Sequence, residues 1–283
     1  MFTTLKKLRN REMHFCDING ACYQISLRKE RLVRYLRDAT SKHEFAKSIE
    51  QRGLPNTVSI HSSNMIKRGE GVDLESQENK LVNIILACDK INGLIIRPNE
   101  VFSFWKTVGI TTRKKGYKAG RVLHKNQLTT GIGGGLCNLA NTIHLLVLHS
   151  PLEVIEFHGH SDALAPDEGK RVPFSAGTSI CYNHIDYRFR NNSDQNIQLL
   201  VWCEGETLHA ELRSESAFPH SYRLVEEDHH FREIGDKFYR ISKIYKETLD
   251  TTSGTVLEKE LILDNQSEVL FDYSLIPQEQ IRE

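Results

Sequence analysis

The sequence lacks any run of apolar residues close to the roughly 20 that a membrane-spanning helix needs. Its first 14 residues include Lys6, Lys7, Arg9 and Arg11, but they lack the apolar stretch and the small-residue cleavage site of a secretory leader. We therefore expect a soluble, cytoplasmic protein. The basic residues can contact an anionic membrane surface, although the stretch holds too few apolar residues to anchor there, so peripheral membrane contact is left open.

The sequence also lacks an excess of charge of either sign. Lys+Arg and Asp+Glu each number 37 among the 283 residues. A protein that binds nucleic acid electrostatically has a basic excess, so we expect no nucleic-acid partner. The 39% of hydrophobic residues is ordinary for a chain that buries a core, and the length allows one large domain or two modest ones.

Metal and cofactor motifs are missing as well. None of the six cysteines shows a Cys-x-x-Cys spacing, and without a leader a disulfide framework is not expected. The order His158, His160, Asp162 is similar to metal-binding arrangements, but no cluster of cysteines or carboxylates follows it. The glycine cluster at 131–135 lacks the Lys-Ser/Thr of a phosphate-binding loop. We expect neither a metal nor a cofactor.

The periodicity of apolar residues predicts helices mainly in the first half of the chain. A charged, helix-prone stretch covers about 28–51, a polar loop about 61–73, and an amphipathic helix about 75–91. A dense apolar run at 136–148 predicts a buried central helix. Short strands are expected among these segments, at 94–96, 101–105, 121–123 and 152–157.

After about residue 172 the pattern changes to the alternation typical of antiparallel strands. Strand patterns lie at 187–189, 197–202 and 208–212, and a closing hairpin is predicted from 237–245 and 255–263. The expected fold class is α+β. A helical N-terminal half, with its central buried helix after a Gly-rich loop, packs on an antiparallel β-rich C-terminal half. We predict a helical extension at 1–58, a core domain at 59–213 and a C-terminal β-hairpin extension at 214–283.

The Gly-rich loop directly before the central helix is the candidate site. Consecutive glycines are costly in backbone entropy, so Gly133, Gly134 and Gly135 indicate positive φ angles, a close approach or exposed amides. Cys137 follows in the first helical turn, where amides and the helix dipole can stabilise a thiolate. His160 lies on the segment returning from the helix and is a candidate general base.

Each of these features also has a purely structural explanation. A glycine cluster before a helix can serve a sharp turn or tight packing, and a cysteine inside an apolar run is usually a core residue. His144 and His149 lie on the predicted helix, and we expect them to be core or edge histidines. His158 is the alternative to His160 as a base.

Several segments in order resemble the VanW family. They are 97–105 (Arg-Pro-Asn-Glu-Val-Phe-Ser-Phe-Trp), 115–117, the Gly-Gly-Gly-Leu-Cys of 133–137, His160-Ser161 and 189–192. The resemblance runs from about residue 59 onward, so the predicted domain at 59–213 is a VanW-like core. Where the family pattern has Gln and Ser after the cysteine, this chain has Asn138 and Ala140. The family pattern also has an Asp in a later segment, whereas residues 175–178 of this chain include no acidic residue. Asp162 or Asp167 is a candidate to take the place of that Asp.

The resemblance implies an association with cell-wall metabolism and vancomycin resistance, but no particular reaction. One hypothesis is a thiol enzyme for acyl transfer or hydrolysis on a peptide or peptidoglycan precursor. Cys137 would be its nucleophile, His160 its base, and the amides of Gly134, Gly135 and Cys137 its oxyanion donors. The alternative is a non-catalytic accessory protein that binds an anionic, small or peptide-like cell-wall ligand. Its binding residues would be Gly133, Gly134, Gly135, Asn138 and Ser161. The sequence leaves the oligomeric state open.

Overall fold

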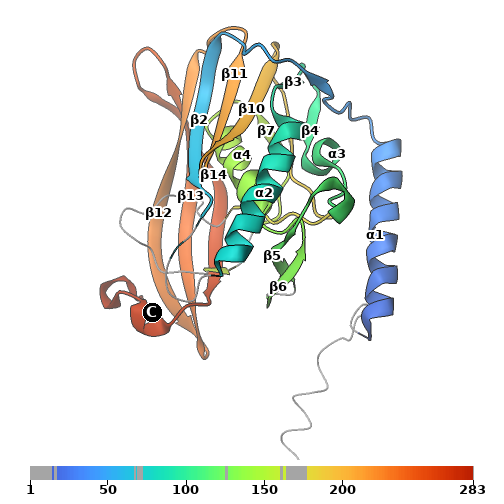
Figure 1. Ribbon diagram of the computed structural model, residues 1–283. Helices are drawn as coiled ribbons and strands as arrows, with labels where there is room; N and C mark the ends of the chain where they lie inside the picture. The colour runs from blue at the N-terminus through green and yellow to red at the C-terminus, as the bar shows by residue number, and fades with distance from the viewer. Residues whose placement is uncertain are drawn as a thin grey trace, which may run out of the picture.

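The computed structural model describes residues 15, 18–66, 68, 73–124, 127–159, 162–163 and 177–282. They form a mixed α+β structure in which helices lie mostly in the N-terminal half and antiparallel strands dominate the C-terminal region (Figure 1). The predicted α+β class is confirmed at this level. The domain boundaries at 58/59 and 213/214 stay predictions. No helix in the described ranges combines the length and apolar content needed to cross a bilayer.

A five-stranded antiparallel sheet supports the main core. Its order is β1 (Ser48–Ile49), β3 (Leu94–Ile96), β10 (Ile197–Glu204), β11 (Thr207–Ser214) and β2 (Asn56–Asn64). The helices α2 (Leu74–Ile91) and α4 (Cys137–Leu148) pack against it, and the buried apolar cluster draws on all of these elements. Because strands from both halves of the chain alternate in one sheet, the halves interleave. The expected packing of a helical half on a β half is therefore too simple.

The polar loop predicted for about 61–73 is wrong at its start, because residues 61–64 belong to β2. This strand lies at the edge of the sheet and pairs with β11 from Asn56↔Ser214 to Asn64↔Thr207. An edge strand is buried on few sides, so it tolerates the serines and His61 that make the segment look like a loop.

The two strongest predicted helices are confirmed as α2 and α4, since their apolar positions recur at helical spacing. The helix predicted at about 28–51 is α1 (Gly20–Thr40), which is shifted toward the N-terminus. Asn19 caps it by accepting a hydrogen bond from the amide of Cys22 at 2.9 Å. α1 docks through polar groups. Arg34 donates to both carboxylate oxygens of Glu156 at 2.6 Å, and the Arg188 guanidinium lies 2.7 Å from the Asp38 carboxylate.

The strand predicted at 101–105 divides into two elements. β4 (Val101–Ser103) pairs with β9 (Arg188–Arg190), which also pairs with β7 (Glu153–Glu156). The chain then turns into the short helix α3 (Phe104–Val108), because the Ser103 side chain accepts a hydrogen bond from the Lys106 amide at 3.2 Å. The hairpin of β5 (Ala119–His124) and β6 (Gln127–Ile132) then leads into the glycine loop.

The C-terminal region forms a second sheet of long strands. Its order is β12 (His220–Ile234), β13 (Lys237–Asp250), β14 (Val256–Val269) and the short parallel strand β8 (Asp162–Ala163). The predicted closing hairpin is confirmed as β13 and β14. The sequence does not indicate β12, since this strand is rich in His, Glu and Arg and has a register irregularity between Glu227 and His230. In Figure 1 these strands rise beside β2 at the edge of the first sheet.

Candidate functional site

The glycine loop turns the chain from β6 into α4 within a few residues. Gly133 and Gly135 have φ angles of 79° and 92°, which L side chains rarely adopt. The amide of Gly133 donates to the carbonyl of Lys118 at 2.9 Å, and the amide of Gly134 donates to the carbonyl of Gly131 at 3.1 Å. Two of the loop amides are therefore bonded within the protein. In particular, the Gly134 amide, which was a predicted oxyanion donor, is already engaged.

Close packing accounts for the absence of side chains in this loop. A Cβ atom on Gly134 would lie 2.2 Å from the carbonyl carbon of Gly120 in the facing strand β5. A Cβ atom on Gly135 would lie 2.2 Å from Cγ of Lys80 on α2. Both separations are far below an ordinary van der Waals contact. Close packing therefore explains why Gly134 and Gly135 carry no side chain, whereas ligand binding by the loop remains a proposal.

Asn83 holds this loop from inside the core, and sequence reasoning missed it. Its side chain is fully buried, donates to the carbonyls of Gly134 at 2.9 Å and Lys118 at 3.1 Å, and accepts from the Lys118 amide at 2.8 Å. A buried amide needs such partners, since an unpaired one is costly. The available signal was an Asn among the mostly apolar residues that α2 buries, next to Ile84 and one turn before Ala87.

Cys137 is the first residue of α4, and its thiol is partly buried. Burial raises the pKa of this thiol, and the proximity of Cys181 adds to the effect. Hydrogen bonds from the amides of Ile180 and of Cys137 itself act in the opposite direction and lower the pKa, but they do not outweigh burial. The sequence predicts a stabilised thiolate here, whereas the tertiary environment favours the neutral thiol.

The segment 177–181 lies across the start of α4; the family resemblance singled out 175–178, whereas Ile180 and Cys181 were not foreseen as part of the site. The Thr178 amide donates a short hydrogen bond to Oδ1 of Asn141, and a Cβ on Gly177 would lie 2.0 Å from the Asn141 side chain. This contact places Ile180 and Cys181 beside Cys137. The sequence carries little signal for it, since about 40 positions separate the two segments along the chain.

The other predicted site residues are only partly brought together. His160 and Ser161 lie outside the described residues. Asn138 is partly buried and its Nδ2 lies 3.5 Å from Oγ of Ser63, while its buried Oδ1 has no partner within the described part of the chain. His158, the alternative base, is engaged elsewhere, with Nε2 3.0 Å from the Glu156 carboxylate.

The two helix histidines take the structural positions expected of them. His144 is buried, its Nδ1 lies 3.1 Å from the Tyr187 hydroxyl, and burial lowers its pKa to about 3. His149 at the end of α4 lies 2.8 Å from the Leu145 carbonyl through Nδ1. The described residues contain no group of three or more His, Cys, Asp or Glu side chains that could hold a metal ion.

The start of α4 combines features that suit an anion. Leu136 occupies the cap position, so no side chain within the described residues caps the helix start, although the Asn138 amide donates to the Gly135 carbonyl at 3.1 Å. The stem of Lys80 packs over Gly135, and its Nζ donates to Oε1 of Gln77 at 2.8 Å. The positive end of the helix dipole therefore lies beside the stem of a lysine, next to a thiol that is held neutral.

Comparison with known proteins places these residues in a family. Residues 79–213, which include the glycine loop and α4, match the family model described as "VanW like protein". The chain is 26% identical over 227 residues to the Vancomycin B-type resistance protein VanW of Enterococcus faecalis, covering 80% of this chain and 82% of that protein. It is 31% identical over 122 residues to the Uncharacterized protein YoaR of Bacillus subtilis, covering 43% and 39%. No solved structure matches.

Proposed function

This chain belongs to the VanW family, and on that premise we propose that it serves vancomycin resistance by binding an anionic group of a cell-wall ligand, without covalent catalysis. One observation carries the proposal. At the start of α4, burial keeps the Cys137 thiol neutral, while the uncapped helix end lies beside Lys80. Such a site supplies positive potential and amide donors, which suit a carboxylate or phosphate. It does not supply the low-pKa thiolate that a nucleophile needs.

The binding experiment compares two ligands that differ in one charge. N-acetyl-alanyl-alanine carries a free carboxylate, and its C-terminal amide is the neutral control. We expect calorimetry to detect the carboxylate form and to find at least about tenfold weaker binding of the amide. Equal affinity for both would contradict an anion site.

Two matched variants test whether Lys80 contributes. Lys80→Met keeps an apolar stem over Gly135 and removes the charge, whereas Lys90→Met removes an exposed charge in the last turn of the same helix. We expect Lys80→Met to weaken carboxylate binding roughly three- to tenfold, because a partly buried charge close to a bound anion contributes about 1 kcal/mol. Lys90→Met should leave it unchanged. Equal effects of the two variants would place the anion elsewhere.

The thiol enzyme is the second candidate, and the hydrogen bond from the Ile180 amide to the Cys137 sulfur favours it. This bond would stabilise a thiolate once formed, and His160 would take the proton. A resistance assay with Cys137→Ser and Cys203→Ser separates the candidates. Binding without catalysis predicts that both variants keep resistance, whereas loss in Cys137→Ser alone would favour the enzyme.

We also propose that α1 makes peripheral contact with an anionic membrane surface. Ile25, Leu32 and Leu36 are 56–59% exposed, and they lie on the side of the helix opposite the docked Arg34 and Asp38. Residues 1–40 hold nine Lys and Arg but four Asp and Glu, although the whole chain is balanced. An exposed apolar stripe with basic neighbours suits the surface of an anionic bilayer.

Vesicle sedimentation tests this contact. We expect the protein to pellet with vesicles of mixed phosphatidylcholine and phosphatidylglycerol, and to do so less with phosphatidylcholine alone. Leu32→Glu should abolish pelleting, whereas Ile234→Glu, an exposed apolar residue at the end of β12, should not. Pelleting that is independent of lipid charge, or unaffected by Leu32→Glu, would contradict the proposal.

A further inference from the structure

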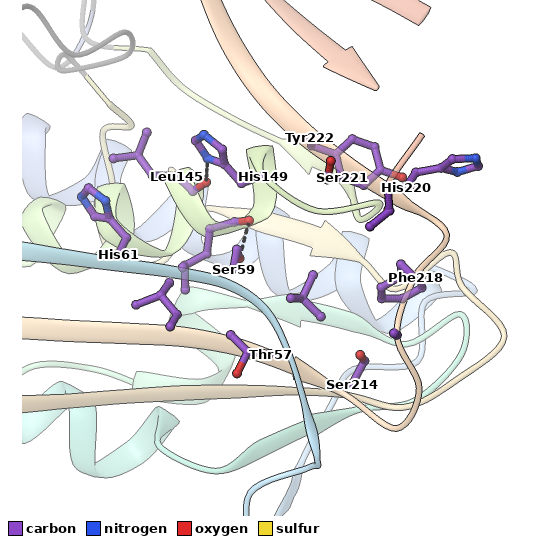
Figure 2. A pocket seen from close by; sticks show the side chains of 15 residues that line it. Thr57, Ser59, His61, Leu145, His149, Ser214, Phe218, His220, Ser221 and Tyr222 are labelled. Carbon is purple, nitrogen blue, oxygen red and sulfur yellow. Dashed lines mark hydrogen bonds between the residues drawn. The ribbon is translucent and has the colours of Figure 1, made fainter. Parts of the chain in front are cut away.

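A cavity lies away from the glycine loop, between the two sheets (Figure 2). Its volume is about 620 Å³, within the range of pockets that bind small ligands. One side is β2, from Thr57 to His61, and the opposite side is the start of β12, from His220 to Tyr222. The end of α4 forms its floor with Leu145, Leu146 and His149. Three elements distant in sequence therefore enclose one space.

Both strands that border the cavity are sheet edges. Among the described strands, β2 pairs with β11 alone, and β12 pairs with β13 alone. An edge strand directs alternate N–H and C=O groups away from its sheet, where they need other partners. Proteins usually protect such edges with charged residues, proline or β-bulges. β2 contains no Lys, Arg, Asp, Glu or Pro over Asn56–Asn64, and its one register irregularity with β11 skips Val58. The cavity therefore borders a strand edge that carries no charged residue or proline.

The chemistry of the cavity walls suits an uncharged backbone. Among the described lining residues no side chain is Asp, Glu, Lys or Arg, and the polar ones are hydroxyls and imidazoles. The pKa of His61 is lowered by burial and by His149, so this imidazole is neutral near neutral pH. Ile60, 67% exposed, and Phe218 supply apolar surface. Such walls can contact small or apolar side chains of a ligand whose main chain pairs with the strand.

We propose that this cavity binds a short extended peptide, which adds a strand beside β2. The five residues of β2 that line it span roughly 16 Å at about 3.3 Å per residue, enough to lie beside four or five residues of a peptide, with main-chain pairing interrupted at Val58. The edge of a second copy of this chain fits less well, because β12 and the loop at Phe218 enclose the opposite side of the cavity. The proposal is independent of the anion site at α4.

Hydrogen exchange with a designed pair of peptides tests the main-chain pairing. The probe is acetyl-Ala-Thr-Ala-Thr-Ala-amide, and its control carries N-methyl groups on alternate amides and so cannot form a complete strand ladder. At a probe concentration about ten times its Kd, we expect amide exchange in residues 57–61 to slow roughly tenfold. The control should leave exchange unchanged. Equal protection by both peptides, or no saturable effect up to about 10 mM, would overturn the proposal.

Matched variants locate the binding edge and exclude self-association. Ile60→Lys places a charge at the cavity, and Ile49→Lys places one on β1, the opposite edge of the same sheet, where Ile49 is also exposed. We expect Ile60→Lys to weaken binding of the probe at least about tenfold, and Ile49→Lys to leave binding unchanged. Light scattering should show a mass independent of concentration. A dimer that Ile60→Lys dissociates would identify a second copy as the occupant and overturn the peptide assignment.

Discussion

Replacing Gly134 by alanine separates the packing role of the triglycine from its conformational role. Gly134 does not have a positive φ, unlike its neighbours Gly133 and Gly135, so alanine introduces no backbone strain. The new Cβ would lie 2.2 Å from the carbonyl carbon of Gly120, more than 1 Å closer than an ordinary contact. The neighbour is backbone, and Asn83 ties the adjoining Lys118 to the Gly134 carbonyl, so neither segment can yield cheaply. We expect a cost near the upper end of the overpacking range, about 3 kcal/mol.

Thermal unfolding followed by circular dichroism measures this cost. A loss of about 3 kcal/mol corresponds to a fall in the unfolding midpoint of roughly 5 °C for a chain of this size. Gly20→Ala is the control, because Gly20 at the start of α1 has no atom within 4 Å of its added Cβ and no positive φ. It should shift the midpoint by no more than about 1 °C. If Gly134→Ala unfolds like the wild type, the packing explanation is wrong, and ligand access becomes the better reason for glycine there.

Three further outcomes follow from the pKa directions and the ion pairs. Burial raises the pKa of the Cys137 thiol, so this thiol should react with iodoacetamide near neutral pH more slowly than N-acetylcysteine does. Intact-mass labelling can measure the rate. A faster reaction than that of N-acetylcysteine would restore the nucleophile hypothesis. His144 is neutral when folded, with a pKa of about 3 against 6.5 unfolded, so the unfolded state binds more protons below pH 6.5. As the pH falls below 6.5, the free energy of unfolding should therefore fall by up to about 1.4 kcal/mol per pH unit. His144→Phe should reduce this dependence on pH, as urea titrations at several pH values can measure. The same dependence in the variant and the wild type would contradict the prediction. Glu156→Gln should lower the free energy of unfolding at neutral pH by about 2–4 kcal/mol, because it leaves Arg34 without its carboxylate, whereas the exposed Glu153→Gln should change it little. The pKa of Glu156 is lowered to about 2, so the stabilisation that its carboxylate contributes is complete above pH 4.5 and is lost as the pH falls toward 2. Equal free energies of unfolding for Glu156→Gln and Glu153→Gln would contradict this.

Elements with a strong apolar period were predictable, and elements whose character depends on their neighbours were not. α2 and α4 repeat apolar residues at helical spacing, and β13 and β14 alternate around a turn, so local patterns suffice for them. β2 and β12 are polar strands at sheet edges, and only their pairing with β11 and β13 makes them strands. Long-range hydrogen bonds decide such segments, and a local pattern cannot report them.

The position of the candidate site was also readable from the sequence, but its chemistry was not. Three glycines before an apolar helix mark a special turn, and Cys137 follows it directly. The helix start alone predicts a lowered thiol pKa. Burial of the thiol in the folded chain and the proximity of Cys181, which comes from a distant segment, raise the pKa instead and outweigh the hydrogen bond from the Ile180 amide.

By itself the sequence determined the family, the central helix and the place where the chain must turn without side chains. Backbone entropy and apolar periodicity are local properties, so they can be read along the chain. Only the tertiary structure decided what the glycines touch, which charge state the thiol favours and which strand edges border a cavity. Gly120, Lys80 and Asn83 meet the loop across the fold, and desolvation depends on everything packed around an atom. The physical reason is that contact and burial are set by segments that the linear order keeps apart.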